Sequence, residues 1–433
     1  MTLHEHQRHA VVGYGVEGKS TAQYLLQHGI KPVILDRKSV NNRELDSHIG
    51  DDWLEEIDSF DLAWRSPSVD PNLLPADRTT SQTQFFLEEC KVPIIGVTAT
   101  KGKGTICSLI TAILRADGYQ VWLVGNIGQP ALNVLDEINS SDANKKIVVY
   151  EMSSFQLWDV TMSPQTAVIG MISQDHLDIH HSLEDYHQAK ARVTKFQTLD
   201  DRLVFNAQSE VSKQLTIDSN AGCVESYNQP KTSHYNTTAI YYRQKKIIER
   251  NKVQLLGDHN AENICAALSV VWPIIQDKSI IETTLEHFSP LEHRMELLPN
   301  KNGISYVNDS YSSNPSATIA AVSSLKSPVV LLLGGAERSQ DYKEVSAQLS
   351  AMTQLKTVIT YGANAKKWGS SLNRLNVEAY IAKTDSFNDI FKLAKELAEA
   401  GDVVLFSPGS PSTDMFSDFT DRGNEFKRLV AEL

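Results

Sequence analysis

The sequence predicts an α/β protein with three domains, in which mostly parallel sheets carry helices on both faces. Its 433 residues exceed what one hydrophobic core usually supports, so more than one domain is expected. Short β-branched runs repeatedly lead into glycine-rich or polar turns and then into helix-like stretches, which is the pattern of doubly wound sheets. Ligands of such sheets bind beyond the carboxyl ends of the strands, so the polar residues after each run are the candidates for a site. The runs are HAVVGYG, VPIIGVTAT, KIVVYEMSS, TAVIGMISQDH, PVVLLLGGA and DVVLFSPGS.

Two breaks in this pattern set the predicted domain boundaries. A helix-like QTQFFLEEC ends near Lys91 and a new buried strand begins near Pro93, and a second break falls between Ser289 and Glu292. We therefore predict domains at residues 1–91, 92–288 and 289–433. The stretch 203–254 has short strand-like pieces and polar turns, which predict a β-rich extension of the middle domain.

Composition and charge exclude several classes of protein. The chain is 41% hydrophobic and 22% charged, as in folded globular proteins. No stretch reaches the roughly 20 apolar residues of a membrane span. The opening MTLHEHQRHA has no apolar signal region, so we expect a cytoplasmic protein. A formal net charge of −12 argues against nucleic-acid binding, and four widely spaced cysteines without a CxxC pair argue against zinc and disulfides.

A glycine-rich motif follows the first strand run. GYGVEG at residues 13–18 precedes a helix-like stretch and Asp36 closes the next strand, which together predict a Rossmann-like first domain. Glycines let the backbone approach a phosphate, and a helix N-terminus attracts any diphosphate, so UDP would fit as well as NAD. An NAD-dependent dehydrogenase is therefore one alternative, and a purely structural tight turn is another.

A second motif combines a buried strand, a Gly-Lys loop and a helix. VPIIGVT at residues 92–98 is followed by ATKGKGT at 99–105 and by ICSLITAILRADG. This is the phosphate-loop order, in which backbone N–H groups surround the β-phosphate and the lysine reaches the β/γ oxygens. It predicts a central ATPase domain with Lys103 at its site. Gly104 stands where Ser or Thr normally holds Mg²⁺, and Thr105 could supply the hydroxyl, whereas a glycine-rich turn with a solvated lysine is the alternative.

Motifs along nearly the whole chain resemble the Mur ligase family. After a loop similar to the family's TGTNGKST come, in family order, GNIG at 125–128, EMSSFQL at 151–157, DHLD at 175–178, YHQAK at 186–190 and GDHNAEN at 257–263. Then follow HR at 293–294, NDS at 308–310, GG at 334–335, SP at 407–408 and DRGNEF at 421–426. EMSSFQL is the segment that distinguishes the D-glutamate-adding branch. The resemblance implies a last domain that is also Rossmann-like and binds the amino acid.

The reaction implied by the resemblance joins UDP-N-acetylmuramoyl-L-alanine to D-glutamate at the expense of ATP, in peptidoglycan precursor synthesis. A carboxylate resists nucleophiles, so the γ-phosphoryl is first transferred to it and the amine of glutamate attacks the acyl phosphate. The site has to neutralise charge on the phosphoryl group and exclude water. We expect an enzyme that acts as a monomer on small molecules.

A magnesium site is expected beside the phosphate loop. Glu151 closes the run KIVVYE and His176 follows TAVIGMIS, so both can converge near Lys103. Mg²⁺ prefers oxygen ligands, so the imidazole ligand is implied by the resemblance. Lys190 as an ammonium would repel the cation, but the matching lysine of the family is carbamylated and helps to bind the metal. An ordinary surface pair of Glu151 and His176, and a solvated Lys190, are the alternatives.

The resemblance also assigns roles to the remaining site residues. The predicted catalytic residues are Lys103, Asn126, Glu151, His176, Lys190 and Arg294. The predicted ATP-binding residues are Thr100, Gly102, Lys103, Gly104, Thr105, Asn263, Arg294 and Asp309. The predicted UDP-substrate residues are Val16, Glu17, Asp36, Arg37, Ser66, Asn126, Ser153 and Gln156. The predicted amino-acid residues are Ser313, Arg338, Ser412 and Phe419, and the predicted metal ligands are Thr105, Glu151, His176 and Lys190.

Some positions depart from the family pattern and leave alternatives open. Ser66-Pro67-Ser68 replaces an SPG turn, and Tyr311 stands where some relatives have lysine. Pro411-Ser412-Thr413 replaces the commoner Ala-Ser, so a preference for L-glutamate stays open. The Gly104-Thr105 pair also suits a folylpolyglutamate synthase-like ligase, although SSFQ and the first domain oppose it. The altered loop would also suit a non-catalytic nucleotide-binding protein.

Overall fold

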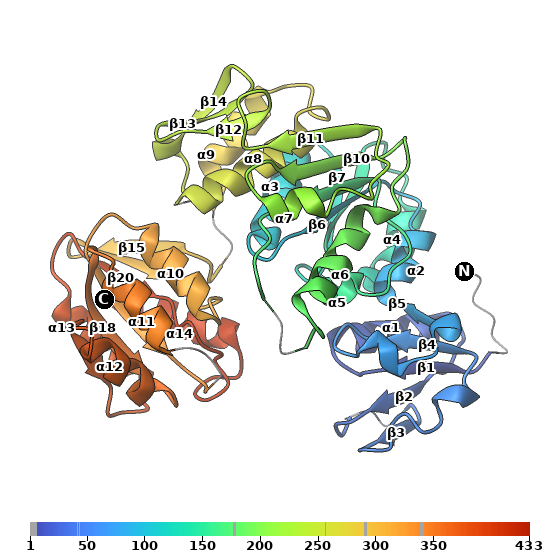
Figure 1. Ribbon diagram of the computed structural model, residues 1–433, viewed down its shortest axis with the longest axis horizontal. Coiled ribbons are helices and arrows are strands. Elements are labelled where there is room, and N and C mark those ends of the chain that lie inside the picture. The colour runs from blue at the N-terminus through green and yellow to red at the C-terminus, as the bar shows by residue number, and fades with distance from the viewer. Residues whose placement is uncertain are drawn as a thin grey trace. The chain divides into compact units, whose positions relative to one another are not determined.

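The structure is a computed structural model that describes residues 7–40, 42, 44–175, 179–255, 257–289, 292–337 and 342–433. Its contacts divide the chain into two compact units, residues 1–250 with 262–285 and residues 251–261 with 286–433. The described residues form four sheets (Figure 1). Within them, no helix is long and apolar enough to cross a membrane.

The first sheet is parallel and has the strand order β3-β2-β1-β4-β5. Its strands are β1 (His9–Val12), β2 (Val33–Asp36), β3 (Ser47–Ile49), β4 (Leu62–Arg65) and β5 (Thr79–Ser81). Its helices are α1 (Val16–Gln27) and α2 (Gln82–Glu89), with 3-10 turns η1 (Ile57–Ser59), η2 (Pro71–Leu73) and η3 (Ala76–Arg78). A Cβ at Gly18 would lie 2.0 Å from the carbonyl oxygen of Gly13, so glycine is needed where α1 crosses the end of β1.

The second sheet is also parallel, with the order β11-β10-β9-β6-β8-β7. Its strands are β6 (Ile94–Thr98), β7 (Gln120–Gly125), β8 (Lys146–Glu151), β9 (Thr166–Ile169), β10 (Arg202–Asn206) and β11 (Cys223–Tyr227). Its helices are α3 (Lys103–Ala116), α4 (Leu135–Ser140), α5 (Ser154–Leu157), α6 (Leu183–Lys195) and α7 (Glu210–Gln214), with η4 (Ala131–Asn133). Strand β6 is buried along its whole length between β8 and β9, so the phosphate loop leaves the interior of this sheet.

A small antiparallel sheet follows, formed by β12 (Ser233–Tyr235), β13 (Ala239–Tyr242) and β14 (Lys245–Glu249). The predicted β-rich extension is therefore present in the middle of the chain, but β10 and β11 belong to the parallel sheet rather than to the extension. The elements η5 (Arg250–Lys252), α8 (Asp258–Val271) and α9 (Ser279–His287) come next.

The fourth sheet has the order β15-β16-β20-β17-β18-β19 and is parallel except for β15. Its strands are β15 (Glu296–Lys301), β16 (Ile304–Asn308), β17 (Val329–Gly334), β18 (Leu355–Tyr361), β19 (Ala379–Ile381) and β20 (Val403–Phe406). Its helices are α10 (Pro315–Ser323), α11 (Tyr342–Ser350), α12 (Ala365–Asn373), α13 (Phe387–Leu397) and α14 (Phe419–Ala431). Helix α13 buries Phe387, Ile390, Phe391 and Ala394, the spacing of one helix face.

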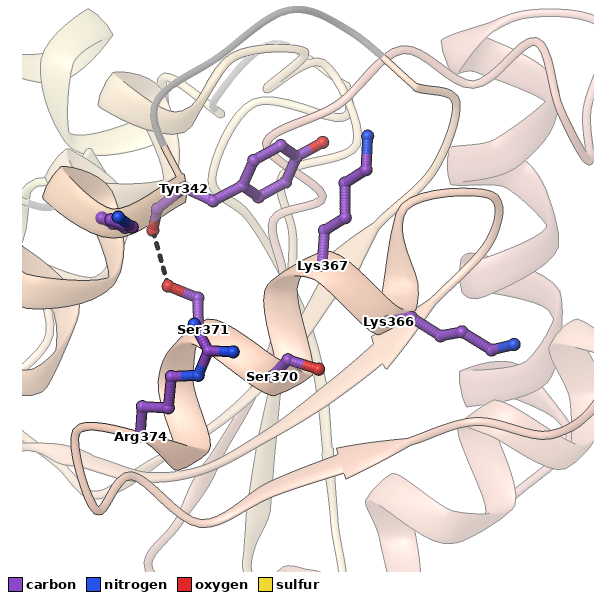
Figure 2. Close-up of a pocket in the computed structure, with 7 residues that line it drawn as sticks. Tyr342, Lys366, Lys367, Ser370, Ser371 and Arg374 are labelled. Carbon is purple, nitrogen blue, oxygen red and sulfur yellow. Dashed lines mark hydrogen bonds between the residues drawn. The ribbon is translucent and has the colours of Figure 1, made fainter.

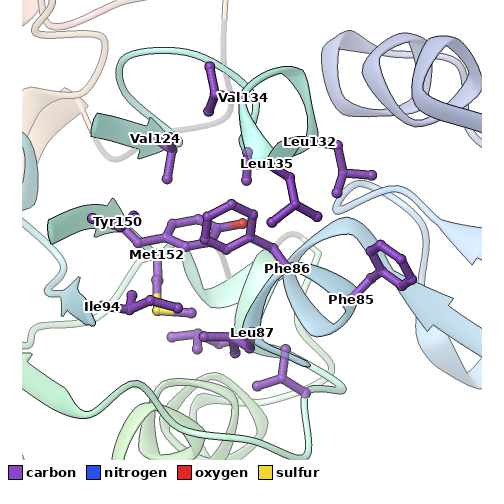
Figure 3. Close-up of a cluster of buried hydrophobic side chains, with 14 of the residues drawn as sticks. Phe85, Phe86, Leu87, Ile94, Val124, Leu132, Val134, Leu135, Tyr150 and Met152 are labelled. Carbon is purple, nitrogen blue, oxygen red and sulfur yellow. The ribbon is translucent and has the colours of Figure 1, made fainter. Parts of the chain in front are cut away.

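One hydrophobic core joins the first two sheets (Figure 3). Phe86 of α2 meets the ring of Tyr150 of β8 edge to face, with 5.5 Å between the ring centroids. The Tyr150 hydroxyl lies 3.0 Å from Thr83 Oγ1 on the same helix. Burial of aromatic side chains on both sides makes α2 a packed connection between the sheets rather than a loose linker.

The α/β class with parallel sheets is confirmed. The predicted boundaries at 91/92 and 288/289 stay predictions, because the two compact units do not test them.

Candidate functional site

The phosphate loop has the strand, loop and helix that the sequence predicted. Strand β6 ends at Thr98 and α3 begins at Lys103, with Gly102 as its N-cap at a φ of 85°. A Cβ at Gly102 would lie 2.2 Å from Asn263 Oδ1, so a larger residue would collide there. Gly102 and Asn263, both predicted to bind ATP, are therefore neighbours. The N-terminus of a long helix at this point favours a phosphate group.

Two lysines converge on one carbonyl group of this loop. Lys103 Nζ donates to the carbonyl oxygen of Ala99 at 2.9 Å, and Lys190 Nζ donates to the same oxygen at 2.9 Å. Lys190 is only 1% exposed. Burial, together with the nearby Lys103 cation, holds the pKa of Lys190 well below its usual value, although Asp175 and Glu151 oppose the shift. Burial at this loop therefore favours the neutral amine of Lys190 more than water does for an ordinary lysine.

Glu151 stands at the end of β8, and one of its oxygens has no partner in the part of the chain that the structure describes. Its side chain is buried, and Asn126 Nδ2 donates to Oε1 at 2.8 Å. Among the described residues no hydrogen-bond partner reaches the buried Oε2. An unpaired buried carboxylate oxygen is costly, and a cation would satisfy it. The donor set present therefore fits a divalent cation at this position.

The other predicted metal ligands are only partly described. Thr105 lies in the first turn of α3 and is half-buried, whereas His176 lies outside the described residues. Within the described part of the chain, no three His, Cys, Asp or Glu side chains gather as a ready-made metal site. Asp175, which no site prediction included, faces Lys101 at 3.9 Å. Its negative charge also opposes the fall in the pKa of Lys190. Its position next to His176 in the DHLD motif could have identified Asp175 as a site residue from the sequence.

Thr100 anchors the loop to its surroundings. Its Oγ1 lies 2.7 Å from the hydroxyl of Tyr186 and donates to the carbonyl oxygen of Ser173 at 2.9 Å. Gly104, where Ser or Thr was expected, is buried inside α3. Thr105, the next residue along α3, carries the hydroxyl that could take its place.

Three predicted UDP-substrate residues meet between α1 and α5. Ser153 caps α5 and forms a capping box with Gln156. Gln156 Nε2 donates to Glu17 Oε1 at 2.5 Å. Burial raises the pKa of Glu17 from an ordinary 4.5 to about 7, while the Gln156 hydrogen bond and the Arg65 charge lower it less.

The raised pKa of Glu17 predicts a pH-dependent stability. Protonation favours the folded protein, so this contribution is fully present below pH 4.5 and is lost as the pH rises through about 7. Glu17→Gln keeps an oxygen that accepts from Gln156 and removes the charge. The variant should be more stable than the wild type at pH 8 by on the order of 1 kcal/mol, with no difference at pH 4. Denaturant unfolding at the two pH values measures this.

A matched control for Glu17 is Glu88, an exposed carboxylate that accepts a hydrogen bond from Gln84 Nε2 at 2.6 Å. Glu88→Gln should leave the stability difference between pH 4 and pH 8 as in the wild type. A Glu17→Gln variant that is equally stable relative to wild type at both pH values would contradict the expected burial of charge.

The other UDP-substrate residues line the glycine-rich turn. Asp36 Oδ2 accepts from the backbone N–H of Tyr14 at 2.6 Å, and Ser66 Oγ donates to the carbonyl oxygen of Gly13 at 2.5 Å. Arg37 lies over the ring of Trp53, and Val16 is 74% exposed in the first turn of α1. The Ser66-Pro67-Ser68 turn closes with a bond from the Val69 N–H to the Ser66 carbonyl oxygen. These residues hold the turn open at the N-terminus of α1, where a diphosphate would be favoured.

A buried ion pair that the sequence analysis missed ties the turn to the second sheet. Arg65 is 2% exposed and donates to both carboxylate oxygens of Asp159, at 2.5 and 2.6 Å. It also donates to the carbonyl oxygen of Phe155 at 2.9 Å. Two parallel bonds of this kind fix orientation as well as distance. The ion pair therefore fixes the position of the Ser66 turn relative to helix α5.

In the second unit, Asp309 lies within the electrostatic reach of Arg294, whose charge lowers the pKa of Asp309. Asp309 is buried and accepts from Ser312 Oγ and Ser407 Oγ, both at 2.6 Å. Burial raises the pKa of Asp309 to about 6, and these hydrogen bonds limit the rise. The Cζ atom of the Arg294 guanidinium lies 3.5 Å from the centroid of the Tyr311 ring. The predicted ATP residues are thus divided between the two units.

The described residues of the predicted amino-acid site are Ser313 before α10, Ser412 in the loop after β20 and Phe419 at the start of α14. Phe419 is 38% exposed and meets the Tyr311 ring edge to face at 5.0 Å. Ser412 is buried and Ser313 is half-buried, whereas Arg338 lies outside the described residues. Tyr311, noted in the sequence only as a departure, contacts both Arg294 and Phe419 and is a further candidate residue.

A pocket of about 340 Å³ lies elsewhere on this unit, between α11 and α12 (Figure 2). Its lining residues are Tyr342, Lys343, Lys366, Lys367, Ser370, Ser371 and Arg374. Among the described residues, none of the predicted site residues lines it, and the predicted Arg338 lies outside the described part of the chain.

Comparison with known proteins agrees with this geometry. Residues 97–271 match the Mur ligase middle domain, and residues 293–409 match the Mur ligase glutamate ligase domain. The chain is 30% identical to the UDP-N-acetylmuramoylalanine--D-glutamate ligase of Clostridium tetani, over 98% of this chain and 96% of that protein. It is 31% identical to the same ligase of Acetivibrio thermocellus, over 97% and 95%.

Solved structures share the fold at low sequence identity. UDP-N-acetylmuramate-alanine ligase MurC of Thermotoga maritima has a TM-score of 0.63 and 16% identity, over 99% of this chain and 100% of that one. MurF ligase of the same organism, in complex with ADP, has a TM-score of 0.62 and 16% identity, over 99% and 96%. Since the similarity in sequence to the curated relatives runs through the phosphate loop and both units, the chain belongs to the Mur ligase family, in the group of UDP-N-acetylmuramoylalanine--D-glutamate ligases.

Proposed function

We propose that this enzyme uses ATP to join D-glutamate to UDP-N-acetylmuramoyl-L-alanine, releasing ADP and phosphate, as a step in peptidoglycan precursor synthesis. The observation that carries the proposal is the site at the end of β6, where Lys103 and Lys190 share the Ala99 carbonyl oxygen near the carboxylate of Glu151. A near-full-length similarity to curated ligases of this name supports the choice of substrates. We also propose that it acts as a monomer in the cytoplasm, with three domains bounded at 91/92 and 288/289.

The chemistry requires activation of a carboxylate. The γ-phosphoryl of ATP is transferred to the alanine carboxylate, and the amine of D-glutamate attacks the carbonyl carbon of the acyl phosphate and displaces phosphate. Lys103, once turned from the Ala99 carbonyl toward phosphate oxygens, would neutralise charge on the transferring group. Backbone N–H groups at the start of α3 would support the β-phosphate.

A magnesium ion suits the buried Oε2 of Glu151, which no described residue hydrogen-bonds. When bound it would neutralise phosphate charge and orient the reacting oxygens. Glu151, His176, Thr105 and Lys190 are the residues we propose to hold it. Asn126, which donates to Glu151 Oε1, would keep Oε2 turned toward the cation.

Carbamylation of Lys190 would resolve the conflict between its cation and the metal. A neutral amine attacks carbon dioxide, forming an N–C bond and releasing a proton, which converts the side chain to a carboxylate. Burial favours the neutral amine that this step needs, because the pKa of Lys190 is lowered well below its usual value. The modified side chain would supply an oxygen ligand beside Glu151.

A substrate panel with phosphate release as the readout tests the proposal. Release should require ATP, UDP-N-acetylmuramoyl-L-alanine and D-glutamate together. Hydroxylamine added with ATP and the muramoyl substrate alone should trap the acyl phosphate as a hydroxamate. Active turnover that ignores the UDP-sugar, or that prefers a folate with glutamate, would refute the proposal, and L-glutamate in the same panel decides the stereochemistry.

A further inference from the structure

The segment between β9 and α6 carries two adjacent histidines that no predicted site uses. His180 is 3% exposed, and its Nε2 lies 2.9 Å from Ser154 Oγ. Its Nδ1 lies 3.1 Å from Asp185 Oδ2. Ser154, His180 and Asp185 therefore form a hydrogen-bonded chain, here named the histidine clamp, that joins this segment to α5 and α6.

The direction of the bonds in the clamp follows from Asp185. Burial alone would raise the pKa of Asp185, but hydrogen bonds from Trp158 and His180 lower it below its usual value. An ionised carboxylate can only accept, so Nδ1–H of His180 donates to it and Nε2 accepts from the Ser154 hydroxyl. Trp158 Nε1 donates to the other oxygen of Asp185 at 2.9 Å.

Aromatic rings fix the orientation of His180. Its ring stacks on Phe155 at 5.0 Å between centroids and 7° between planes. The Trp158 ring lies at 4.3 Å, and Tyr186 meets it edge to face at 5.4 Å. With packing on three sides, the imidazole cannot turn without breaking the clamp.

Each member of the clamp lies a short way along the chain from one of three predicted metal ligands. Ser154 follows Glu151 by three residues, at the start of α5. Asp185 precedes Lys190 by five residues in α6. His180 itself follows His176 by four residues. The ligands come from three separate segments, and the clamp is a direct link among those segments.

The neighbouring His181 attaches the same segment to the first sheet. Its Nε2 lies 2.9 Å from Asp70 Oδ2 and 3.2 Å from Asn72 Nδ2, both near η2. The segment is thus held at one residue by α5 and α6 and at the next by the turn that follows Ser66.

Ser, His and Asp in this order also make the nucleophilic triad of many hydrolases. Ser154 is only 2% exposed and lies against packed aromatic side chains, so a substrate carbonyl has no access to its hydroxyl. The arrangement is therefore suited to holding structure and not to attack on a substrate.

We propose that His180 is a positioning residue that ties α5 to α6 through Ser154 and Asp185, and so sets the mutual geometry of Glu151 and Lys190. The inference rests on the proposed function, since it assigns the clamp to the magnesium site of the ligase. Groups that orient metal ligands in this way typically change metal affinity or activity by about 10- to 100-fold when removed.

His180→Phe tests the inference because it keeps a ring against Phe155 and Trp158 and removes both hydrogen bonds. The Mg²⁺ concentration for half-maximal phosphate release should rise about 10- to 100-fold. The KM for D-glutamate should stay within about twofold, because the predicted amino-acid residues belong to the other unit. Binding of Mn²⁺ in the presence of ADP, followed by electron paramagnetic resonance, should weaken in parallel and needs no turnover.

Ser154 variants and a matched histidine control sharpen the test. Ser154→Ala should shift the Mg²⁺ dependence in the same direction, whereas Ser154→Thr, which keeps a hydroxyl, should show the wild-type dependence. The double variant with Ser154→Ala and His180→Phe should be no worse than His180→Phe alone. His234→Phe is the control, since His234 stacks on Tyr241 at 5.1 Å in the antiparallel sheet, away from the clamp. It should leave the Mg²⁺ dependence unchanged.

An unchanged Mg²⁺ dependence in folded His180→Phe would overturn the inference, as would a shift that His234→Phe shares. If His180→Phe does not fold, Ser154→Ala decides by the same two criteria. A wild-type protein that releases no phosphate from the ligase substrates would instead refute the proposed function. The Mn²⁺ measurement would still judge the clamp in that case.

Discussion

Replacing Lys103 with alanine is expected to lower kcat by about 1,000-fold or more while the protein stays folded. Its ammonium lies at the start of α3, where it can reach the charge that develops on the transferred phosphoryl group. Removal of a charge aimed at such a transition state typically costs 10²- to 10⁵-fold in rate. Phosphate release at saturating substrates measures the loss, and thermal unfolding shows that the fold is kept.

Lys101 in the same loop provides the comparison. Its side chain is 43% exposed and faces Asp175 at 3.9 Å, so it is a partly exposed cation of the same type. Lys101→Ala should keep kcat within about tenfold of the wild type, since exposed ion pairs contribute little. Equal losses in the two variants would mean that general charge near the loop, and not Lys103 itself, supports turnover.

The second large effect is expected at Lys190, where the sign of the charge should decide activity. Lys190→Arg keeps a permanent cation near Glu151, and it should lower kcat by about 1,000-fold because a cation there opposes the metal. Lys190→Glu supplies a carboxylate, as a carbamate would, and should retain at least about tenfold more activity than the arginine variant. Steady-state phosphate release across a Mg²⁺ titration compares the two.

A spectroscopic measurement separates carbamylation from a simple charge effect. Wild-type protein in ¹³C-bicarbonate should show a carbamate carbonyl resonance that is absent from both Lys190 variants. An arginine variant as active as the glutamate variant, or a wild-type spectrum without the resonance, would contradict the proposed role of Lys190.

The local parts of the site could be predicted from the sequence because they are made of contiguous residues. Strand β6, the Gly-Lys loop and α3 follow one another directly, and their hydrophobic pattern and glycines specify that order. The same holds for GYGVEG between β1 and α1. Motif order along the chain also identified the family, which the relatives confirm.

The cross-links between these parts were not predictable in the same way. Arg65 and Asp159 pair across 94 residues of chain, and no periodicity relates the two positions. His180 and His181 are adjacent in the sequence and give no sign of different roles. In the structure, His180 contacts Ser154 and His181 contacts Asp70. The convergence of Lys103 and Lys190 on a single carbonyl oxygen likewise depends on how α6 packs against β6.

By itself, the sequence determined the α/β class, the phosphate loop, the family and the residue types that the chemistry needs. Each of these depends only on the spacing and order of residues along the chain. The tertiary structure decided which charges are buried, which oxygen of Glu151 has no hydrogen-bond partner among the described residues, and that His180 links α5 to α6. Burial and pairing arise when distant segments pack together, and packing sets the local dielectric and the distances on which pKa values and ligand geometry depend.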